Sequence, residues 1–276
     1  MAERAILPSV PAHRKAKTAA LRALSLDSTL ADSYVALGAI TSTYDKDFGA
    51  AEKYYLQALA LNPGLVTAHQ SYSYMLMKLR RFDESLQHAR RAVEIDPLSN
   101  LANINLAVLF FYMRDFEALA QQCRKMLELD AQHAFAHIMM AQALARTGQG
   151  PAAYRELEAL TDRPKDHPLT IREHAEISAV LGRQDLAEMD LLSLIRKKNG
   201  TGFFPSSYIA IVYASLGQRD RAFEWLEKAY AEQDSFLSLL QVYPAYDSLR
   251  SDPRYSSLLA RLGIIAGTPP GSARIP

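Results

Sequence analysis

The stretch AAEKYYLQALALNP, residues 50–63, decides the fold because it returns along the chain at a constant interval. ESLQHARRAVEIDP begins 34 residues later, at Glu84, and ALAQQCRKMLELDA follows after the same interval, at Ala118. The first two copies have small residues at matching places and end on Asn-Pro or Asp-Pro. Small side chains let helix axes approach closely, and proline is tolerated at a helix start but costs about 3 kcal/mol inside one. The period therefore predicts repeated helical hairpins.

The same frame indexes most of the chain. Tyr34, Leu37 and Gly38 set its register in the first hairpin, and LGQRDRAFEWLEKAY (residues 216–230) sets it in the last. The first helices are predicted near residues 31–44, 66–79, 100–113, 134–147, 168–181 and 204–216. The second helices are predicted near 48–61, 82–95, 116–129, 151–160, 184–197 and 219–232. One extra residue in STYDKD (42–47) lengthens the first unit, and the period is lost in TDRPKDHP (161–168).

This pattern resembles the tetratricopeptide repeat, whose units of about 34 residues stack into arrays. The resemblance implies an all-α, right-handed superhelical solenoid of about six hairpins, with the first helices lining its concave side. We expect the array to span residues 15–232 and a capping segment, residues 233–264, to follow it. That segment breaks the period and closes with a short helix near 253–262, and residues 265–276 are expected to form a disordered tail.

The amino end differs from the carboxyl end. KAKTAALRALSLD (residues 15–27) fits a second helix, but the first helix of that hairpin would begin before Met1. Residues 1–14 are therefore expected to be a partial leading segment of a fragment, or of the tail of a longer protein.

Residues 206–264 carry a more specific resemblance, through YASLG (213–217), AFEWLEKAY (222–230), VYPAYDSLRSDPRY (242–255) and LLARLG (258–263). They resemble the C-terminal repeat module of bacterial multidomain regulators, in which a winged-helix DNA-binding domain, a kinase or a nucleotide cyclase precedes the array. The resemblance implies a regulatory or sensory role in signalling or transcription. The 276 residues of the sequence contain no basic recognition helix and no glycine-rich phosphate loop.

The charge composition disfavours nucleic acid and anionic membranes as partners. With 31 Lys and Arg against 30 Asp and Glu, the net charge of +1 gives no field that would attract nucleic acid or an anionic membrane. No apolar run reaches the ~20 residues that span a bilayer, and no signal peptide is recognisable. We expect a cytoplasmic protein whose partner is a protein or peptide, with a homo-oligomer or a preceding domain as further possibilities.

The sequence offers little for catalysis or metal binding. His133 and His137 lie four residues apart, but Ala134 stands where a zinc hydrolase has glutamate. His69 and His137 occupy the same repeat position, which favours a packing role. Cys123 falls on a packing face and is expected to be a buried apolar group. We expect no catalytic residue, no metal and no cofactor.

A ligand groove is carried over from the resemblance onto residues 2, 5, 9, 12 and 13 of each first helix. The predicted groove residues are Gln70, Tyr74, Met77, Lys78, Ile104, Asn105, Val108, Phe111, Tyr112, Ile138, Gln142, Arg146, Arg172 and Glu176. This surface suits an extended peptide or short helix with apolar anchors, with Lys78 or Arg146 pairing an acidic group. The alternative is that several of these residues only pack hairpin on hairpin.

The leading hypothesis is a non-catalytic protein-interaction module. A self-associating scaffold is the alternative, and a small-molecule or catalytic role in the groove is a third hypothesis that a closed pocket with converging polar groups would favour.

Overall fold

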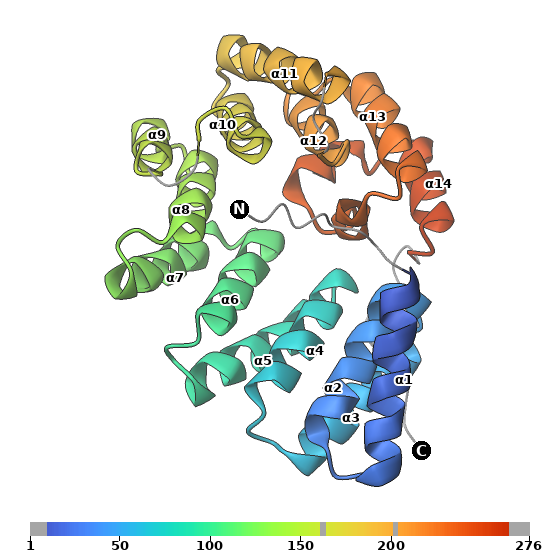
Figure 1. The fold of residues 1–276 in the computed structure, drawn as a ribbon. Helices are drawn as coiled ribbons and strands as arrows, with labels where there is room; N and C mark the ends of the chain where they lie inside the picture. Colours follow the sequence, from blue (N-terminus) through green and yellow to red (C-terminus); the bar gives the residue numbers. More distant parts are fainter. Residues whose placement is uncertain (1–9, 161–163, 201–203, 265–276) are drawn as a thin grey trace. The chain divides into compact units, whose positions relative to one another are not determined.

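The computed structural model describes residues 10–160, 164–200 and 204–264, and these ranges contain helices and turns without a β-strand (Figure 1). The α-helices are α1 (Val10–Leu26), α2 (Ala31–Ile40), α3 (Phe48–Leu61), α4 (Val66–Lys78), α5 (Phe82–Ile95), α6 (Asn100–Met113), α7 (Phe116–Leu129), α8 (Ala134–Arg146), α9 (Gly150–Glu158), α10 (Pro168–Val180), α11 (Gln184–Asn199), α12 (Ser207–Ser215), α13 (Arg219–Ala231) and α14 (Pro253–Arg261). A π-helical turn, η1 (Thr41–Asp45), and two 3₁₀ helices, η2 (Ser235–Leu239) and η3 (Pro244–Leu249), complete the set.

Consecutive helices pack as hairpins, which confirms the all-α repeat predicted from the period. The first and second helices of the hairpins are α2 and α3, α4 and α5, α6 and α7, α8 and α9, α10 and α11, and α12 and α13. Each of these first helices begins within three residues of its predicted start. The structure divides into two compact units, residues 1–106 (unit 1) and 107–276 (unit 2), with the boundary inside α6.

Small residues lie where the helices cross. Ala51 and Ala58 in α3, and Ala89 and Ala92 in α5, are all completely buried. The tightest approach is at Gly38 in α2, where a Cβ atom would lie 2.8 Å from the Tyr55 ring. Glycine is therefore required at position 38 because the ring of α3 occupies the space of a side chain.

The extra residue of the first unit is accommodated as a π-turn. α2 runs directly into η1, whose wider turn takes one more residue than an α-helical turn. Backbone N–H of Asp47 still reaches the carbonyl of Thr41 at 3.2 Å. The chain consequently enters α3 in the register that the sequence predicts.

The turns between first and second helices share one left-handed residue. The residues at 46, 80, 114, 148 and 182 recur every 34 positions and all have positive φ, from 55° to 78°. The last two are Gly148 and Gly182, whereas the first three are Lys46, Arg80 and Arg114. A side chain in this conformation costs on the order of 1–2 kcal/mol relative to glycine.

The capping segment, residues 233–264, folds as η2, η3 and α14 within unit 2. η3 packs against α12, and α14 is joined to α13 by two ion pairs, Arg254 with Asp220 (2.8 Å) and Arg261 with Glu227 (2.7 Å). The predicted tail, residues 265–276, and most of the predicted leading segment, residues 1–9, lie outside the described residues. Helix α1 begins at Val10.

Candidate functional site

The predicted groove residues lie on the first helices α4, α6, α8 and α10. Within each unit, we call the surface formed by these residues the first-helix face of that unit. In α4 the residues Gln70, Tyr74 and Lys78 are spaced by four, so they share one side of the helix. The adjacent side of α4, one residue earlier and about 100° round the helix, carries His69 and Ser73, whose side chains contact α5. The side of α4 with His69 and Ser73 therefore holds the hairpin together, and the side with Tyr74 and Lys78 is separate from it.

Two groove residues of unit 1 join neighbouring hairpins. Asn105 in α6 donates its side-chain N–H to the backbone carbonyl of Gln70 at 3.1 Å, and the Gln70 amide reaches Ser99 Oγ at 3.4 Å. Both amides are buried. Met77 is fully buried and Ile104 is partly buried. These side chains fix the spacing of α4 and α6.

Tyr74 and Lys78 are the open part of the first-helix face of unit 1. The Tyr74 side chain is 42% exposed, and Lys78 Nζ lies 5.5 Å from the centroid of its ring. Burial lowers the pKa of Lys78, and the nearby positive charge of Lys46 lowers it further. No carboxylate among the described residues forms an ion pair with Lys78, so the charge of this lysine is uncompensated.

In unit 2 the first-helix face is covered by the chain itself. The covering stretch is residues 242–255, which we call the crossover segment. The Tyr243 ring packs at 5.6 Å from Phe111 and 6.0 Å from Tyr112, between ring centroids. Burial raises the pKa of the Tyr243 hydroxyl well above its ordinary value, so the hydroxyl stays protonated and can donate.

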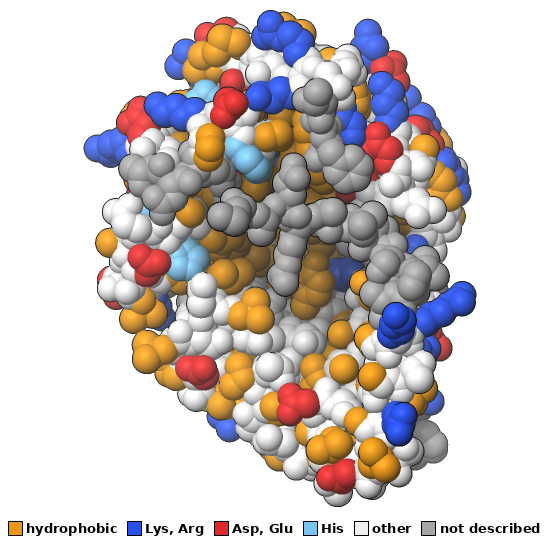
Figure 2. Space-filling model, viewed as in Figure 1, with side chains coloured by type: hydrophobic (Ala, Val, Ile, Leu, Met, Phe, Trp, Pro, Cys, Tyr) orange, Lys and Arg blue, Asp and Glu red, His pale blue; other side chains and the backbone are white. Residues whose placement is uncertain are grey.

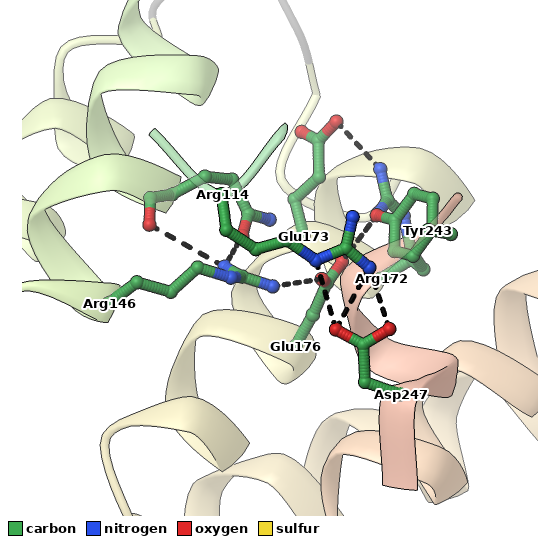
Figure 3. A network of polar contacts seen from close by, with 8 residues as sticks. Arg114, Arg146, Arg172, Glu173, Glu176, Tyr243 and Asp247 are labelled. Carbon is green, nitrogen blue, oxygen red and sulfur yellow. Dashed lines mark hydrogen bonds and ion pairs between the residues drawn. The ribbon is translucent and has the colours of Figure 1, made fainter. Parts of the chain in front are cut away.

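Beneath Tyr243 lies a buried ionic network centred on Glu176 (Figure 3). One carboxylate oxygen of Glu176 accepts from Arg146 at 2.8 Å, and the other accepts from Arg172 at 2.7 Å and from the Tyr243 hydroxyl at 2.8 Å. Arg172 also donates to the Tyr243 oxygen at 2.7 Å and to Glu173 at 3.1 Å. Glu176 is 0% exposed, so the two arginines supply the charge that its burial requires.

The electrostatics of Arg172 follow from this arrangement. Burial by itself would lower its pKa, but the neighbouring Tyr243, Glu173 and Glu176 outweigh that effect and raise the pKa above the ordinary value. Arg146 also donates to the side-chain oxygen of Gln142 one turn earlier in α8. The structure brings together four of the predicted groove residues, Gln142, Arg146, Arg172 and Glu176. Their side chains bind one another within unit 2.

A second anchor of the crossover segment is missing from the predicted set. Arg114 binds the Asp247 carboxylate with two nitrogens, Nη2 at 2.6 Å and Nε at 3.0 Å, and donates to the backbone carbonyl of Val242 at 2.8 Å (Figure 3). A signal for Arg114 was present in the sequence, because it occupies the turn position that is glycine at 148 and 182. Of the remaining groove residues, Ile138 is buried and Val108 is partly buried.

Neither the cysteine nor the possible metal ligands of the chain are placed for chemistry among the described residues. Burial first, and then the charge of Glu156, raises the pKa of Cys123 to about 12, so the thiol stays protonated at neutral pH. Within the described ranges there is no group of three His, Cys, Asp or Glu residues that could hold a metal ion. On the face shown in Figure 2, basic and acidic side chains are interspersed, in keeping with the balanced composition.

Histidines at the repeat position of His69 have a hydrogen-bonding role in addition to packing. His69 and His137 each place Nε2 at 3.1 Å from the carbonyl oxygen six residues earlier, and Asn103 makes the same contact at 2.9 Å. Because Nε2 of His69 donates to that carbonyl, its Nδ1 accepts from Nδ1–H of His88 at 2.8 Å. The two rings thus join α4 to α5 through one hydrogen bond.

We expect acid to destabilise the hairpin of α4 and α5 through this pair. Burial and the neighbouring His69 lower the pKa of His88. The unfolded chain therefore binds protons more readily, so stability present above the unfolded pKa of about 6.5 is lost as the pH falls through the lower folded value. Urea midpoints at pH 7.5 and 5.5 should fall more in the wild type than in His69→Asn/His88→Gln.

The double variant copies the next hairpin, where Asn103 and Gln122 occupy the same two repeat positions and are buried. It keeps donors and acceptors but cannot titrate in this range. An equal fall in both proteins would assign the acid sensitivity to other groups.

No helix in the described part of the chain combines the length and the apolar character needed to cross a bilayer. Neither a protein-family model nor a curated protein sequence gives a significant match to the chain. Solved structures do match. A tetratricopeptide repeat protein from Parabacteroides merdae is 14% identical with a TM-score of 0.66, over 83% of this chain and 90% of that one.

Two further structures are similar over a shorter part of the chain. PilW, a widely conserved type IV pilus biogenesis factor, is 19% identical with a TM-score of 0.58, over 68% of this chain and 87% of its own. YrrB, a tetratricopeptide repeat protein with an unusual peptide-binding site, is 16% identical with a TM-score of 0.51, over 67% and 95%. The chain therefore has the tetratricopeptide repeat fold, an all-α array of helical hairpins.

Proposed function

We propose that the protein is a non-catalytic protein-interaction module that holds a short segment of a partner protein on its first-helix face. The observation that carries this proposal is the crossover segment. In unit 2 the first-helix face already holds a stretch of polypeptide, through the ring and hydroxyl of Tyr243 and the carboxylate of Asp247. A surface built from this fold and these residue types is thus compatible with binding a short stretch of polypeptide that includes a 3₁₀ turn.

The partner's site is proposed to lie in unit 1, around Tyr74 and Lys78. Tyr74 offers an exposed aromatic face and Lys78 an uncompensated charge, whereas Gln70, Asn105 and Met77 are buried. The groove residues of unit 2 are proposed to serve the crossover segment. YrrB, which is described as having a peptide-binding site, supports the assignment of peptide binding at the level of the fold.

The regulatory setting is a further part of the proposal. Residues 206–264 resemble the repeat module of bacterial regulators, and binding on the first-helix face would be the input of such a module. The absence of any catalytic role is supported by the buried, protonated Cys123 and by the hydrogen bonds that engage His69 and His137. The nearly neutral net charge favours a protein partner over nucleic acid.

Affinity capture from a lysate of the source cells tests the proposal with matched variants. We expect a partner retained by the wild type to be lost with Tyr74→Ala/Lys78→Ala, because aromatic and charged anchors dominate such interfaces. The control is Leu56→Ala, which removes an apolar side chain that is 51% exposed on the second helix α3. A partner lost with Leu56→Ala and kept with the double variant would place binding on the second helices.

A further inference from the structure

Three successive hairpin turns carry a basic residue in a strained conformation. Lys46, Arg80 and Arg114 recur at intervals of 34 residues and have φ values of 55°, 61° and 64°. At the next two equivalent turns the residue is glycine, which adopts positive φ without strain. Non-glycine residues held in this region cluster where a function requires them. The side chains at these turns therefore call for a functional reason.

Arg114 provides such a reason within unit 2. Its guanidinium binds the Asp247 carboxylate with two nitrogens and donates a third hydrogen bond to the main-chain carbonyl of Val242. The side-chain carboxylate belongs to the 3₁₀ helix η3 and the backbone carbonyl lies two residues before that helix, so Arg114 contacts one short stretch of acidic polypeptide and not an isolated anion. Tyr243, four residues before Asp247, supplies an aromatic anchor that packs on Phe111 and Tyr112 of α6.

Arg80 stands at the equivalent turn of unit 1. Its side chain is exposed, and within the described ranges it forms no ion pair. It follows Lys78 by two residues, at the end of α4 where Lys78 Nζ lies 5.5 Å from the centroid of the exposed Tyr74 ring. Among the described residues neither Lys78 nor Arg80 forms an ion pair, so an acidic segment would supply the missing negative charge.

We infer that Arg80, with Lys78 and Tyr74, forms a recognition site for an acidic segment of a partner protein, one that carries an aromatic side chain and a carboxylate about four residues apart. This inference rests on the proposed function and specifies its ligand. Arg80 would bind the partner's carboxylate and a main-chain carbonyl as Arg114 does, and Tyr74 would pack against the aromatic side chain. The crossover segment of the chain itself is the pattern for that ligand.

The test uses a fluorescent peptide with blocked termini and the sequence LQVYPAYDSLR, residues 240–250, and measures its anisotropy with the full chain. We expect saturable binding to the wild type. Binding should weaken about tenfold or more when the aspartate of the peptide is replaced by asparagine, and by a similar factor in the Arg80→Gly protein, since charged bidentate contacts are among the strong ones. The control is Arg90→Gln, on the exposed side of α5.

Arg80→Gly also separates recognition from folding. It places at this turn the residue found at 148 and 182, so the variant should melt at the same temperature as the wild type or higher while binding the peptide less well. Equal binding of the peptide by wild type and Arg80→Gly, or no binding by the wild type at millimolar protein, would overturn the inference. A captured partner lost with Tyr74→Ala/Lys78→Ala but kept with Arg80→Gly would leave the proposed function standing and refute this inference alone.

Discussion

Replacing Glu176 by alanine is expected to lower the free energy of unfolding by about 3–5 kcal/mol, the largest effect of any single change considered for unit 2. The carboxylate is completely buried and neutralises both Arg146 and Arg172. Its removal leaves two mostly buried guanidinium groups without their shared counter-charge and takes an acceptor from the Tyr243 hydroxyl. Denaturant unfolding, followed by far-ultraviolet circular dichroism, measures the loss.

Two further variants show whether the loss comes from buried charge. Glu176→Gln keeps one oxygen acceptor but removes the charge, so its loss should be intermediate. Glu224→Ala removes the partner of Arg221 at a pair whose side chains are 54% and 62% exposed, and should cost at most about 1 kcal/mol. If Glu176→Ala unfolded at the wild-type denaturant concentration, the ionic network would not hold the crossover segment in place.

Gly38→Ala is expected to destabilise unit 1 by about 2–3 kcal/mol, near the upper part of the range for overpacked cores. The added Cβ would lie 2.8–3.0 Å from three atoms of the Tyr55 ring. That ring is 1% exposed and is itself stacked on Tyr72 at 5.5 Å, so it has no room to move away. Thermal unfolding of the variant measures the effect.

The matched control is Gly49→Ala, in the exposed first turn of α3, where a Cβ would meet only Asp47 Oδ1 at 3.7 Å. This substitution should be neutral or slightly stabilising. The smaller side chain in Gly38→Ala/Tyr55→Leu should recover part of the loss, so the two single effects should not add. Strict additivity would mean that the close contact between α2 and α3 does not set the cost.

Local features of the sequence were sufficient to predict where the helices lie. The small residues at Ala51, Ala58, Ala89 and Ala92 recur where helices cross, and these positions are buried as the period predicted. The extra residue in STYDKD was recognised, but its conformation was not, because a π-turn and a longer loop satisfy the same spacing.

The site was predicted less completely. Spacing within α4 and α10 places Tyr74, Lys78, Arg172 and Glu176 on one side of their helices, since helical geometry alone decides that. That Glu176 would be covered by Tyr243, 67 residues later, depends on the path of the capping segment, and no local pattern encodes a contact of that separation.

Arg114 has one property that the sequence predicts, its position in the repeat, and one that it does not, its long-range partner. Its pairing with Asp247 spans 133 residues and could not be predicted from one sequence. Its place in the turn, by contrast, follows from the 34-residue frame, in which a basic residue stands where later repeats have glycine. Comparing equivalent positions across the repeats would therefore have singled out Lys46, Arg80 and Arg114.

Photo-crosslinking in the source cells tests whether a partner protein binds the first-helix face, with a benzophenone amino acid placed at position 74 on that face or at position 56 on a second helix. Both native side chains are exposed, by 42% and 51%, so a probe at either site reaches the solvent. We predict a specific adduct with another protein from position 74 and none from position 56. Adducts from position 56 alone would contradict the assignment of partner binding to the first-helix face.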